Sequence, residues 1–165
     1  MEFVLRKWEL NDLDSLVNYA NNRNISKYMT NQFPNPYLPE NGKVFIDMAM
    51  KNEPTNIFAI EIEGKASGGI GLHLQSDVHE KNAELGYWLA EPFWGNGITS
   101  KAITQMIDYG FATFDINRIF AVPYGTNKGS QRVLEKAGFV LEARFDKTIF
   151  KNGEYLDEMV YAIRK

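Results

Sequence analysis

The chain has 165 residues, of which 44% are apolar, and a chain of this size can bury the core of one globular domain without covalent staples. It contains no cysteine, which excludes disulfides, cysteine-ligated zinc and thiol nucleophiles and suits a reducing compartment, so we expect a cytoplasmic protein. The formal net charge is −3 and the basic residues are scattered, which argues against a general nucleic-acid or membrane-surface binder. No apolar run reaches the ~20 residues that cross a bilayer, and no signal-peptide order is present.

The first third of the chain combines a strand with two helices. A strand is predicted over Phe3–Arg6, and a helix over Asp12–Asn22, where apolar residues recur at three- and four-residue spacing. Prolines interrupt the stretch 30–39, which predicts a loop, and a second helical pattern covers Gly42–Lys51. The loop region carries aromatic residues that either wall an acceptor pocket or pack as core: Tyr28, Phe33 and Tyr37.

The middle of the chain passes from strands to the clearest helix. Strands are predicted over Ile57–Ile62 and Ala66–Leu74, joined by the turn Glu63-Gly64-Lys65, whose glycine can take a positive φ. A further strand covers Asn82–Leu89. The segment Ile98–Phe114 repeats its apolar residues with a helical period, so the chain changes there from strand to helix.

The last third is expected to end in a hairpin. Arg118–Val122 is strand-like, and Asn127 opens a short helix that ends before Gly138, a glycine in the usual C′ position. The segments Val140–Phe150 and Tyr155–Ile163 flank the turn Lys151-Asn152-Gly153-Glu154 and predict the closing hairpin.

These elements together predict the fold class. Runs of strands with helices between them favour a mixed sheet covered by helices, which is an α/β or α+β layered fold. No repeat, low-complexity tract or linker divides the sequence. We therefore expect a single domain over residues 1–165.

The segment from strand to helix at Glu84–Ala102 is suited to anion binding. The first N–H groups of a helix have no partners within the helix, and the helix dipole adds partial positive charge, so backbone donors can hold a diphosphate. Gly95 and Gly97 allow close approach of the backbone, and Thr99 and Ser100 can add hydroxyl donors. Turn chemistry alone explains two such glycines equally well, as an ordinary loop leading into a helix.

The flanking residues resemble a known family. The run Tyr87-Trp88-Leu89, followed by Pro92-Phe93-Trp94-Gly95-Asn96-Gly97-Ile98-Thr99-Ser100-Lys101-Ala102, is similar to the acetyl-CoA signature of the GCN5-related N-acetyltransferases, in the branch of the ribosomal-protein N-terminal acetyltransferases. A second block, Asn127 to Phe139, resembles the family's Asn-x-x-Ser helix ending in Lys-x-Gly-Phe. The resemblance implies a mixed, mostly antiparallel sheet with splayed central strands and helices on both faces.

The resemblance also implies a coenzyme site. The pyrophosphate of acetyl-CoA would lie on the loop and helix start, the pantetheine arm would pair with backbone groups that the splay frees at the end of the strand, and the Asn127 side chain would contact that arm. Asn127 stands just before a helix, so N-capping explains it equally well. Ile98, Thr99 and Lys101 depart from the family pattern, and the β-branch of Thr99 leaves coenzyme affinity open. The expected coenzyme-binding residues are Trp88, Leu89, Ala90, Trp94, Gly95, Asn96, Gly97, Ile98, Thr99, Ser100 and Asn127.

Three residues are candidates for proton transfer. Acetyl transfer needs a neutral amine, stabilisation of the tetrahedral oxyanion and a proton for the departing thiolate. Glu84, on the strand that leads into the site, is the candidate base, directly or through water, and a solvated strand carboxylate is the other interpretation. Ser130 is the candidate acid, or the group that orders a water in that role, although a first-turn hydroxyl often bonds to backbone. Many relatives use a tyrosine, and Tyr124 is the local substitute.

The sequence leaves several functions open. The leading hypothesis is an acetyl-CoA-dependent N-acetyltransferase for a primary amine, either a protein N-terminus or a small molecule such as a polyamine or aminoglycoside. A non-catalytic acyl-CoA sensor would keep the loop but need no proton transfer, and a nucleotide-binding enzyme lacks its glycine and lysine motifs here. The two histidines, His73 and His79, have no metal partner at ligand spacing, so no metal is expected. We expect a monomer or a homodimer.

Overall fold

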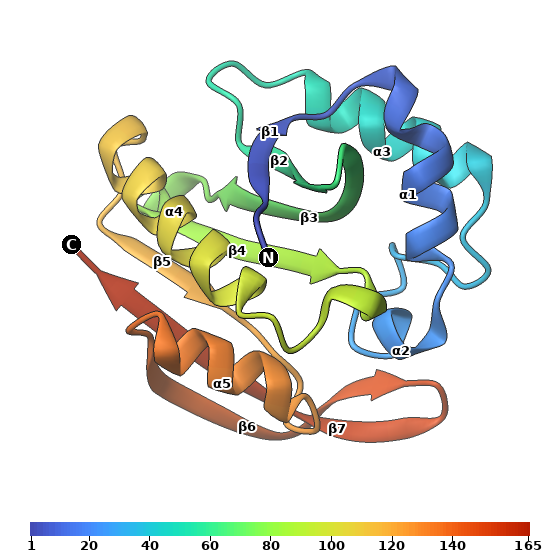
Figure 1. The fold of residues 1–165 in the computed structure, drawn as a ribbon. Helices are drawn as coiled ribbons and strands as arrows, with labels where there is room; N and C mark the ends of the chain where they lie inside the picture. The colour runs from blue at the N-terminus through green and yellow to red at the C-terminus, as the bar shows by residue number, and fades with distance from the viewer. The chain divides into compact units, whose positions relative to one another are not determined.

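A computed structural model describes residues 1–165 and contains seven strands in the order β1-β2-β3-β4-β5-β7-β6 (Figure 1). The β4–β5 pairing is parallel, whereas β1–β2, β2–β3, β5–β7 and β6–β7 are antiparallel, which confirms the mixed, mostly antiparallel sheet. The strands are β1 (Val4–Lys7), β2 (Ile57–Ile62), β3 (Lys65–Leu74), β4 (Asn82–Leu89), β5 (Arg118–Ala121), β6 (Val140–Lys151) and β7 (Glu154–Arg164).

Five α-helices and three 3₁₀-helices connect the strands. The α-helices are α1 (Leu13–Ala20), α2 (Arg23–Ser26), α3 (Pro39–Met50), α4 (Ile98–Thr113) and α5 (Lys128–Lys136). The 3₁₀-helices are η1 (Leu10–Asp12), η2 (Asp77–His79) and η3 (Glu91–Phe93). None of these helices combines the length and the apolarity that crossing a bilayer requires.

The chain forms two compact units, each made of two separate segments. The first unit contains residues 1–71 and 87–98, and the second contains residues 72–86 and 99–165. The division falls inside β3, inside β4 and at the start of α4, because these elements have residues in both units. The expectation of a single domain over 1–165 stays a prediction.

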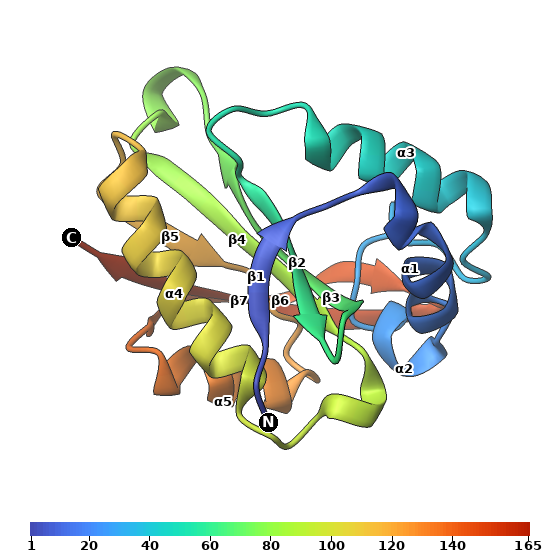
Figure 2. The same ribbon diagram turned by 45° about the horizontal axis from the view of Figure 1, so that its top comes forward.

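The first unit includes β1, β2 and most of β3, together with α1 and α3, which lie side by side (Figure 2). The two residues between β2 and β3, Glu63 and Gly64, both have positive φ, of 51° and 75°, as a type I′ hairpin turn requires. This turn confirms the hairpin predicted over β2 and β3. In the core of the same unit, Trp8 packs edge-on against Phe45, with ring centroids 5.1 Å apart.

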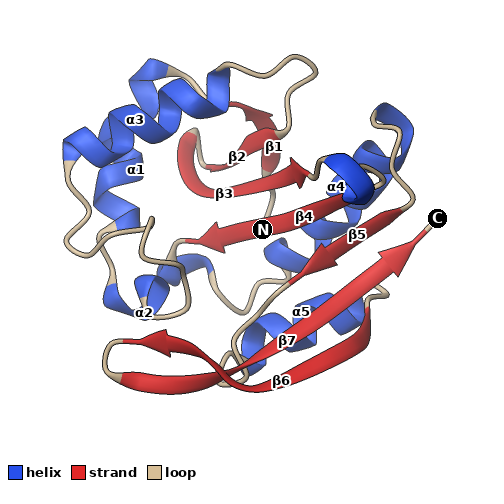
Figure 3. Ribbon diagram, turned by 180° about the vertical axis from the view of Figure 1, so that it is seen from behind, coloured by secondary structure: helices blue, strands red, loops and turns tan.

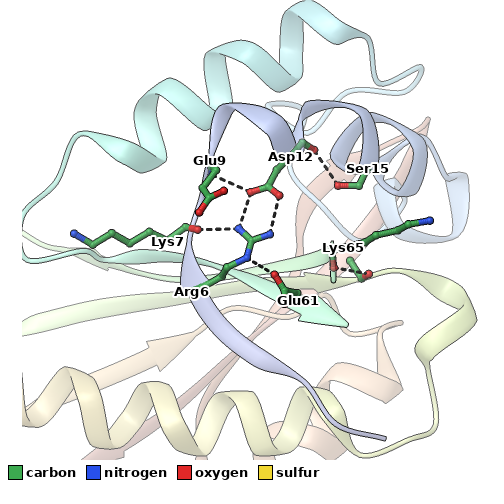
Figure 4. A network of polar contacts seen from close by, with 8 residues as sticks. Arg6, Lys7, Glu9, Asp12, Ser15, Glu61 and Lys65 are labelled. Atoms are coloured by element: carbon green, nitrogen blue, oxygen red, sulfur yellow. Dashed lines mark hydrogen bonds and ion pairs between the residues drawn. The ribbon is translucent and has the colours of Figure 1, made fainter. Parts of the chain in front are cut away.

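An ion-pair network joins the start of the chain to β2 (Figure 4). The Arg6 guanidinium donates to both carboxylate oxygens of Asp12, at 2.8 Å each, and to Glu61. Burial acts to raise the pKa of Asp12, but hydrogen bonds from Arg6 and from the Glu9 N–H outweigh it and lower that pKa. Asp12 therefore holds β1 against α1, and the helix predicted from Asp12 begins at Leu13.

Two helices in the first unit differ from the sequence-based expectation. The helix predicted from Gly42 begins at Pro39, because proline is suited to the first helical position, where no intrahelical N–H is needed. The four-residue α2 was not predicted, since one turn is too short to show a periodic apolar pattern. Asn22 caps α2 by accepting a hydrogen bond from the Asn24 N–H at 2.8 Å.

The second unit contains β5, β6 and β7, with α4 and α5 on one face of these strands (Figures 1 and 3). Gly110 permits the close approach of α4, because a Cβ at this position would lie 2.5 Å from the Leu72 side chain. The end of α5 is a Schellman motif: Gly138 has φ 94° and donates to Glu135, and Phe139 donates to Leu134. The predicted glycine stop is confirmed.

The pairing of the two central strands ends early. The register of β4 with β5 consists of three pairs, from Asn82↔Arg118 to Glu84↔Phe120, and it ends before Leu85. The alternation of burial along β4 also breaks near Gly86 and Tyr87, which are both half-buried. The splay of the central strands beyond this point, which the family resemblance implies, stays a prediction.

Candidate functional site

The loop between β4 and α4 has the backbone conformation that its glycines predict. Gly95 has φ 78° and Gly97 has φ 72°, both in the left-handed region that other residues enter at a cost. A Cβ added at either glycine would have no non-neighbouring atom within 4 Å. Packing within the chain therefore does not require glycine at these two positions. The positive φ favours glycine there, and the space above the loop is open.

Side chains of the loop itself stabilise this conformation. The Trp94 indole N–H donates to the Leu89 carbonyl at 2.7 Å, although the ring remains 45% exposed. The Asn96 side-chain amide donates to the carbonyls of Phe93 and Trp94 at 3.1 and 3.2 Å. These three hydrogen bonds stabilise the conformation of the loop. We call Trp94–Gly97 the glycine loop below.

The glycine loop leads directly into α4, which has 16 residues. The first turn of a helix of this length presents backbone N–H groups and the positive end of the helix dipole. Thr99 and Ser100 lie half-buried in that turn. A glycine loop followed by such a helix start can bind a phosphate or diphosphate without a lysine.

The end of β4 corrects one expectation. The Ala90 N–H, expected to be freed by the splay, donates to the Ser67 carbonyl of β3 at 2.8 Å, so it is not available to a pantetheine amide. The Leu89 carbonyl already accepts from Trp94. The Trp88 indole packs into the core of the first unit, in space left by Gly69, whose Cβ would lie 2.9 Å from the Trp88 Nε1. Of the backbone groups expected to bind the pantetheine arm at the end of β4, only those of Trp88 and Leu89 remain candidates.

The residues that depart from the family pattern have different environments. Ile98 is 1% exposed and therefore acts as a core residue. Lys101 is exposed at the surface of α4. Thr99 is half-buried beside the glycine loop, and its effect on coenzyme affinity stays a prediction to be measured.

In the second unit, three predicted residues come together at the start of α5. The Asn127 side chain accepts a hydrogen bond from the Ser130 N–H at 3.1 Å, which confirms the N-cap, and the Asn127 N–H donates to the Tyr124 carbonyl at 2.9 Å. Burial and the negative charge of Glu158 raise the pKa of the Tyr124 hydroxyl. Tyr124 is therefore a phenol, able to donate a proton, throughout the neutral range.

Comparison with known proteins gives the family of the chain. Residues 2–140 match the family described as "Acetyltransferase (GNAT) domain". The chain belongs to the GNAT acetyltransferase family. Bacillus subtilis YoaA, an uncharacterized N-acetyltransferase, is 37% identical to the GNAT chain over 98 residues, which are 59% of this chain and 55% of YoaA. Bacillus subtilis YdaF, provisionally named a ribosomal N-acetyltransferase, is 34% identical over 103 residues, 62% of this chain and 56% of YdaF.

The chain thus spans just over half the length of these two curated relatives. A solved structure is similar over nearly the whole GNAT chain: Microcin C7 self immunity acetyltransferase MccE, in complex with acetyl-CoA and AMP. Its TM-score is 0.84 at 27% identity, and the match covers 99% of this chain and 93% of that one. The family resemblance seen in the sequence is confirmed.

Glu84 of the GNAT chain lies on β4 at the last residue pair formed with β5, opposite Phe120. Its side chain is half-buried, and alternation places it on the same strand face as Gly86. His73 lies beside that face, with its Nε2 3.5 Å from the position of a Gly86 Cβ. Glu84 therefore lies at the end of the β4–β5 pairing, and its role as a base stays a prediction. No group of three or more metal-ligating side chains is present.

Three side chains near the predicted residues were not singled out from the sequence. Gln131 is buried and donates to the carbonyls of Tyr124 and Gly125, at 3.2 and 3.1 Å. Glu158 pairs with Tyr124 as a β-bridge and accepts from Thr148 at 3.1 Å. Glu91 accepts hydrogen bonds from residues almost seventy positions away. Gln131 and Glu91 lie inside the two segments that the sequence analysis examined, but no position of the motifs marks either of them, and Glu158 lies outside both segments.

The aromatic residues of the proline-bearing region pack instead of lining an open surface. Tyr37 is 4% exposed, and burial raises the pKa of its hydroxyl to about 12. Phe33 contacts both Tyr37 and Trp88, with ring centroids 5.1 and 5.7 Å apart. The Tyr28 ring lies under the Lys27 ammonium, 5.0 Å from its centroid. Of the two alternatives, an acceptor-pocket wall or core packing, Phe33 and Tyr37 therefore follow the second.

Replacing Asn127 separates its two candidate roles. Asn127→Ala removes the cap acceptor, so we expect a loss of about 1 kcal/mol of stability, or roughly 2–4 °C in Tm for a chain of this size. Asn127→Asp keeps an oxygen at the cap but removes the Nδ2 donor. If Nδ2 contacts the pantetheine arm, Asn127→Asp should melt like the wild type and yet bind coenzyme A more weakly, by titration calorimetry. Unchanged affinity in both variants would leave the cap as the whole role of Asn127.

Proposed function

We propose that this chain is an acetyl-CoA-dependent N-acetyltransferase that transfers an acetyl group to a primary amine. The observation that carries the proposal is the glycine loop: two glycines at positive φ, with open space above them, lead into the 16-residue α4 of a chain that belongs to the GNAT family. In the similar MccE structure, acetyl-CoA is bound. The cofactor is therefore proposed to be acetyl-CoA, as a cosubstrate, with no metal.

The proposed reaction is direct transfer in a ternary complex. The neutral amine nitrogen attacks the thioester carbonyl carbon, a carbon–nitrogen bond forms, and the carbonyl oxygen takes the negative charge of the tetrahedral intermediate. The carbon–sulfur bond then breaks. The amine loses its proton to Glu84 directly or through water, and the thiolate gains one from Ser130, Tyr124 or a water that they order. The products are the amide and coenzyme A.

A protein N-terminal α-amine is the proposed acceptor. The acetyl-CoA block and the Asn-x-x-Ser block resemble the ribosomal-protein N-terminal acetyltransferase branch, and the similarity to YdaF supports that choice. A small-molecule amine is the second candidate, because MccE, a microcin self-immunity acetyltransferase with AMP bound, is similar over 99% of this chain. With its cysteine-free sequence, the enzyme is proposed to act in the cytoplasm.

Turnover against a panel of acceptors tests the proposal. Release of coenzyme A from acetyl-CoA is followed with peptides bearing free or blocked N-termini, with spermidine and with an aminoglycoside. We expect turnover with at least one free amine and none with the blocked peptide. A protein that binds coenzyme A but releases none with any amine would be the acyl-CoA sensor, and the enzymatic proposal would be withdrawn.

Glu84→Gln tests the proposed base. Because the attacking amine must be neutral, kcat/KM should rise with pH. Removal of the base should lower kcat/KM about tenfold at neutral pH, which is less than the roughly hundredfold minimum of typical general-base effects because water can relay the proton. The same substitution at the exposed Glu80, also in the second unit, is the control and should leave the profile unchanged. An intact pH profile in Glu84→Gln would assign the proton transfer to solvent or another group.

A further inference from the structure

Glu91 joins the segment that precedes the glycine loop to a distant part of the first unit. It follows directly on Ala90, whose N–H is anchored on Ser67, and it is the first residue of η3. Its carboxylate accepts hydrogen bonds from the Asn22 Nδ2 at 2.7 Å and from the Asn24 Nδ2 at 3.0 and 3.1 Å. We call Glu91, Asn22 and Asn24 the carboxylate clamp.

Each of the three side chains in the carboxylate clamp makes more than one hydrogen bond. Asn22 accepts the Asn24 N–H with its Oδ1 while its Nδ2 binds Glu91, so one side chain both caps α2 and holds the carboxylate. Asn24 also accepts from Lys27, at 3.5 Å. Hydrogen bonds from Asn22 and from Asn24 lower the pKa of Glu91, so the clamp contains a carboxylate, not a carboxylic acid.

Ring contacts run in parallel with the clamp. Phe93, the last residue of η3, packs edge-on against Tyr19 in the last turn of α1, with centroids 6.0 Å apart. Trp88, at the end of β4, packs against Phe33. The residues on both sides of Glu91 are thus held by the segment 19–33, which contains α2. A displacement of η3 must either carry α2 with it or break the clamp.

The short α2 is the element most easily altered by such a displacement. An isolated helical turn has almost no stability of its own, because nucleation costs more than its few hydrogen bonds return. The side-chain contacts that hold α2 to the rest of the unit include both asparagines of the clamp. Ile25 anchors the apolar side of α2 in the core of the unit, and the Glu91 carboxylate holds the polar side through these two asparagines.

We propose that Glu91 is a positioning residue that couples the glycine loop to α2, so that coenzyme binding orders the segment 22–28. This inference rests on the proposed coenzyme site. When a ligand fixes the glycine loop, η3 is fixed with it, and the carboxylate then holds Asn22 and Asn24 in place. By reciprocity, an ordered α2 strengthens coenzyme binding by the same factor. Coenzyme binding would in this way prepare the region of Tyr28 and the proline-bearing loop before the acceptor arrives.

Amide hydrogen exchange with and without coenzyme A tests the coupling. The reporters are the N–H groups of Ser26 and Lys27, which donate to Asn22 and Arg23 within α2. We expect coenzyme A to slow their exchange about tenfold in the wild type, within the 5- to 150-fold range of typical couplings. In Glu91→Gln, an NH₂ group replaces one oxygen and faces the asparagine donors, so the protection should fall below about twofold.

Two further variants complete the test. Glu2→Gln removes an exposed carboxylate from the same unit and should keep the full protection. Glu91→Asp keeps the negative charge and should recover part of the protection that Glu91→Gln loses. A merely structural role for Glu91 would lower the protection of α2 equally with and without coenzyme A, and this result would overturn the coupling.

The outcome also separates this inference from the proposed function. If calorimetry shows coenzyme A bound to the wild type while exchange in α2 is unchanged, the coupling is wrong and the acetyltransferase proposal stands. The coupling is equally wrong if Glu91→Gln binds coenzyme A and retains tenfold protection. If coenzyme A does not bind to the wild type at all, both proposals fall together.

Discussion

Gly97→Val is expected to weaken coenzyme A binding about a hundredfold, which corresponds to about 2.8 kcal/mol at 1.4 kcal/mol per factor of ten. Gly97 has φ 72° and open space above it, so apart from the strain of its own left-handed backbone the valine meets no other residue of the chain. It does fill the space through which a diphosphate would reach the backbone N–H groups at the start of α4. Titration calorimetry with coenzyme A measures the loss.

A matched glycine controls for backbone strain in this experiment. Gly64, in the β2–β3 turn, has φ 75° and also no neighbour within 4 Å of a would-be Cβ. A β-branched residue in the left-handed region costs roughly 1–2 kcal/mol at either position. Gly64→Val should therefore lower Tm as much as Gly97→Val and leave coenzyme affinity intact. If Gly97→Val binds coenzyme A as tightly as Gly64→Val does, the glycine loop is not part of the coenzyme site.

Ser130→Ala is expected to lower kcat about a hundredfold, the lower end of general acid–base effects, while the affinity for acetyl-CoA changes little. Protonation of the departing thiolate is needed in the transition state and not in the coenzyme complex, so the hydroxyl contributes only to turnover. The Ser130 N–H that bonds to Asn127 is retained in alanine, and the cap of α5 should survive. Steady-state kinetics with an accepted amine, together with calorimetry, separates the two quantities.

Another helical serine provides the control for Ser130. The Ser15 hydroxyl, in α1, donates to the Asp12 carbonyl at 3.0 Å, which is the ordinary structural use of such a group. Ser15→Ala should change stability slightly and kcat not at all. Full turnover in Ser130→Ala would transfer the role of acid to Tyr124, whose raised pKa keeps it protonated, or to a bound water.

Local patterns were enough to predict most of the elements and part of the candidate site. The helix that begins at Ile98, the caps of α5 at Asn127 and Gly138, and the two hairpins with their turns all depend on residues within a few positions of each other. Such short-range rules act through backbone φ and ψ, apolar period and side-chain caps, which a sequence displays directly. The glycine loop belongs to the same class, because its two φ values follow from its glycines.

The contacts between distant residues were decided only by the tertiary structure. Ala90 loses its expected freedom because β3 brings the Ser67 carbonyl within 2.8 Å of its N–H. The carboxylate of Glu91 meets Asn22 and Asn24, 69 and 67 positions away, and no local pattern marks any of the three. A hydrogen bond across such a separation depends on how whole elements pack, and the free energy of packing is spread over many side chains. The sequence by itself therefore determined the conformation of the loop that we propose binds the coenzyme, and the packing of the first unit decided which distant residues hold the segment before it.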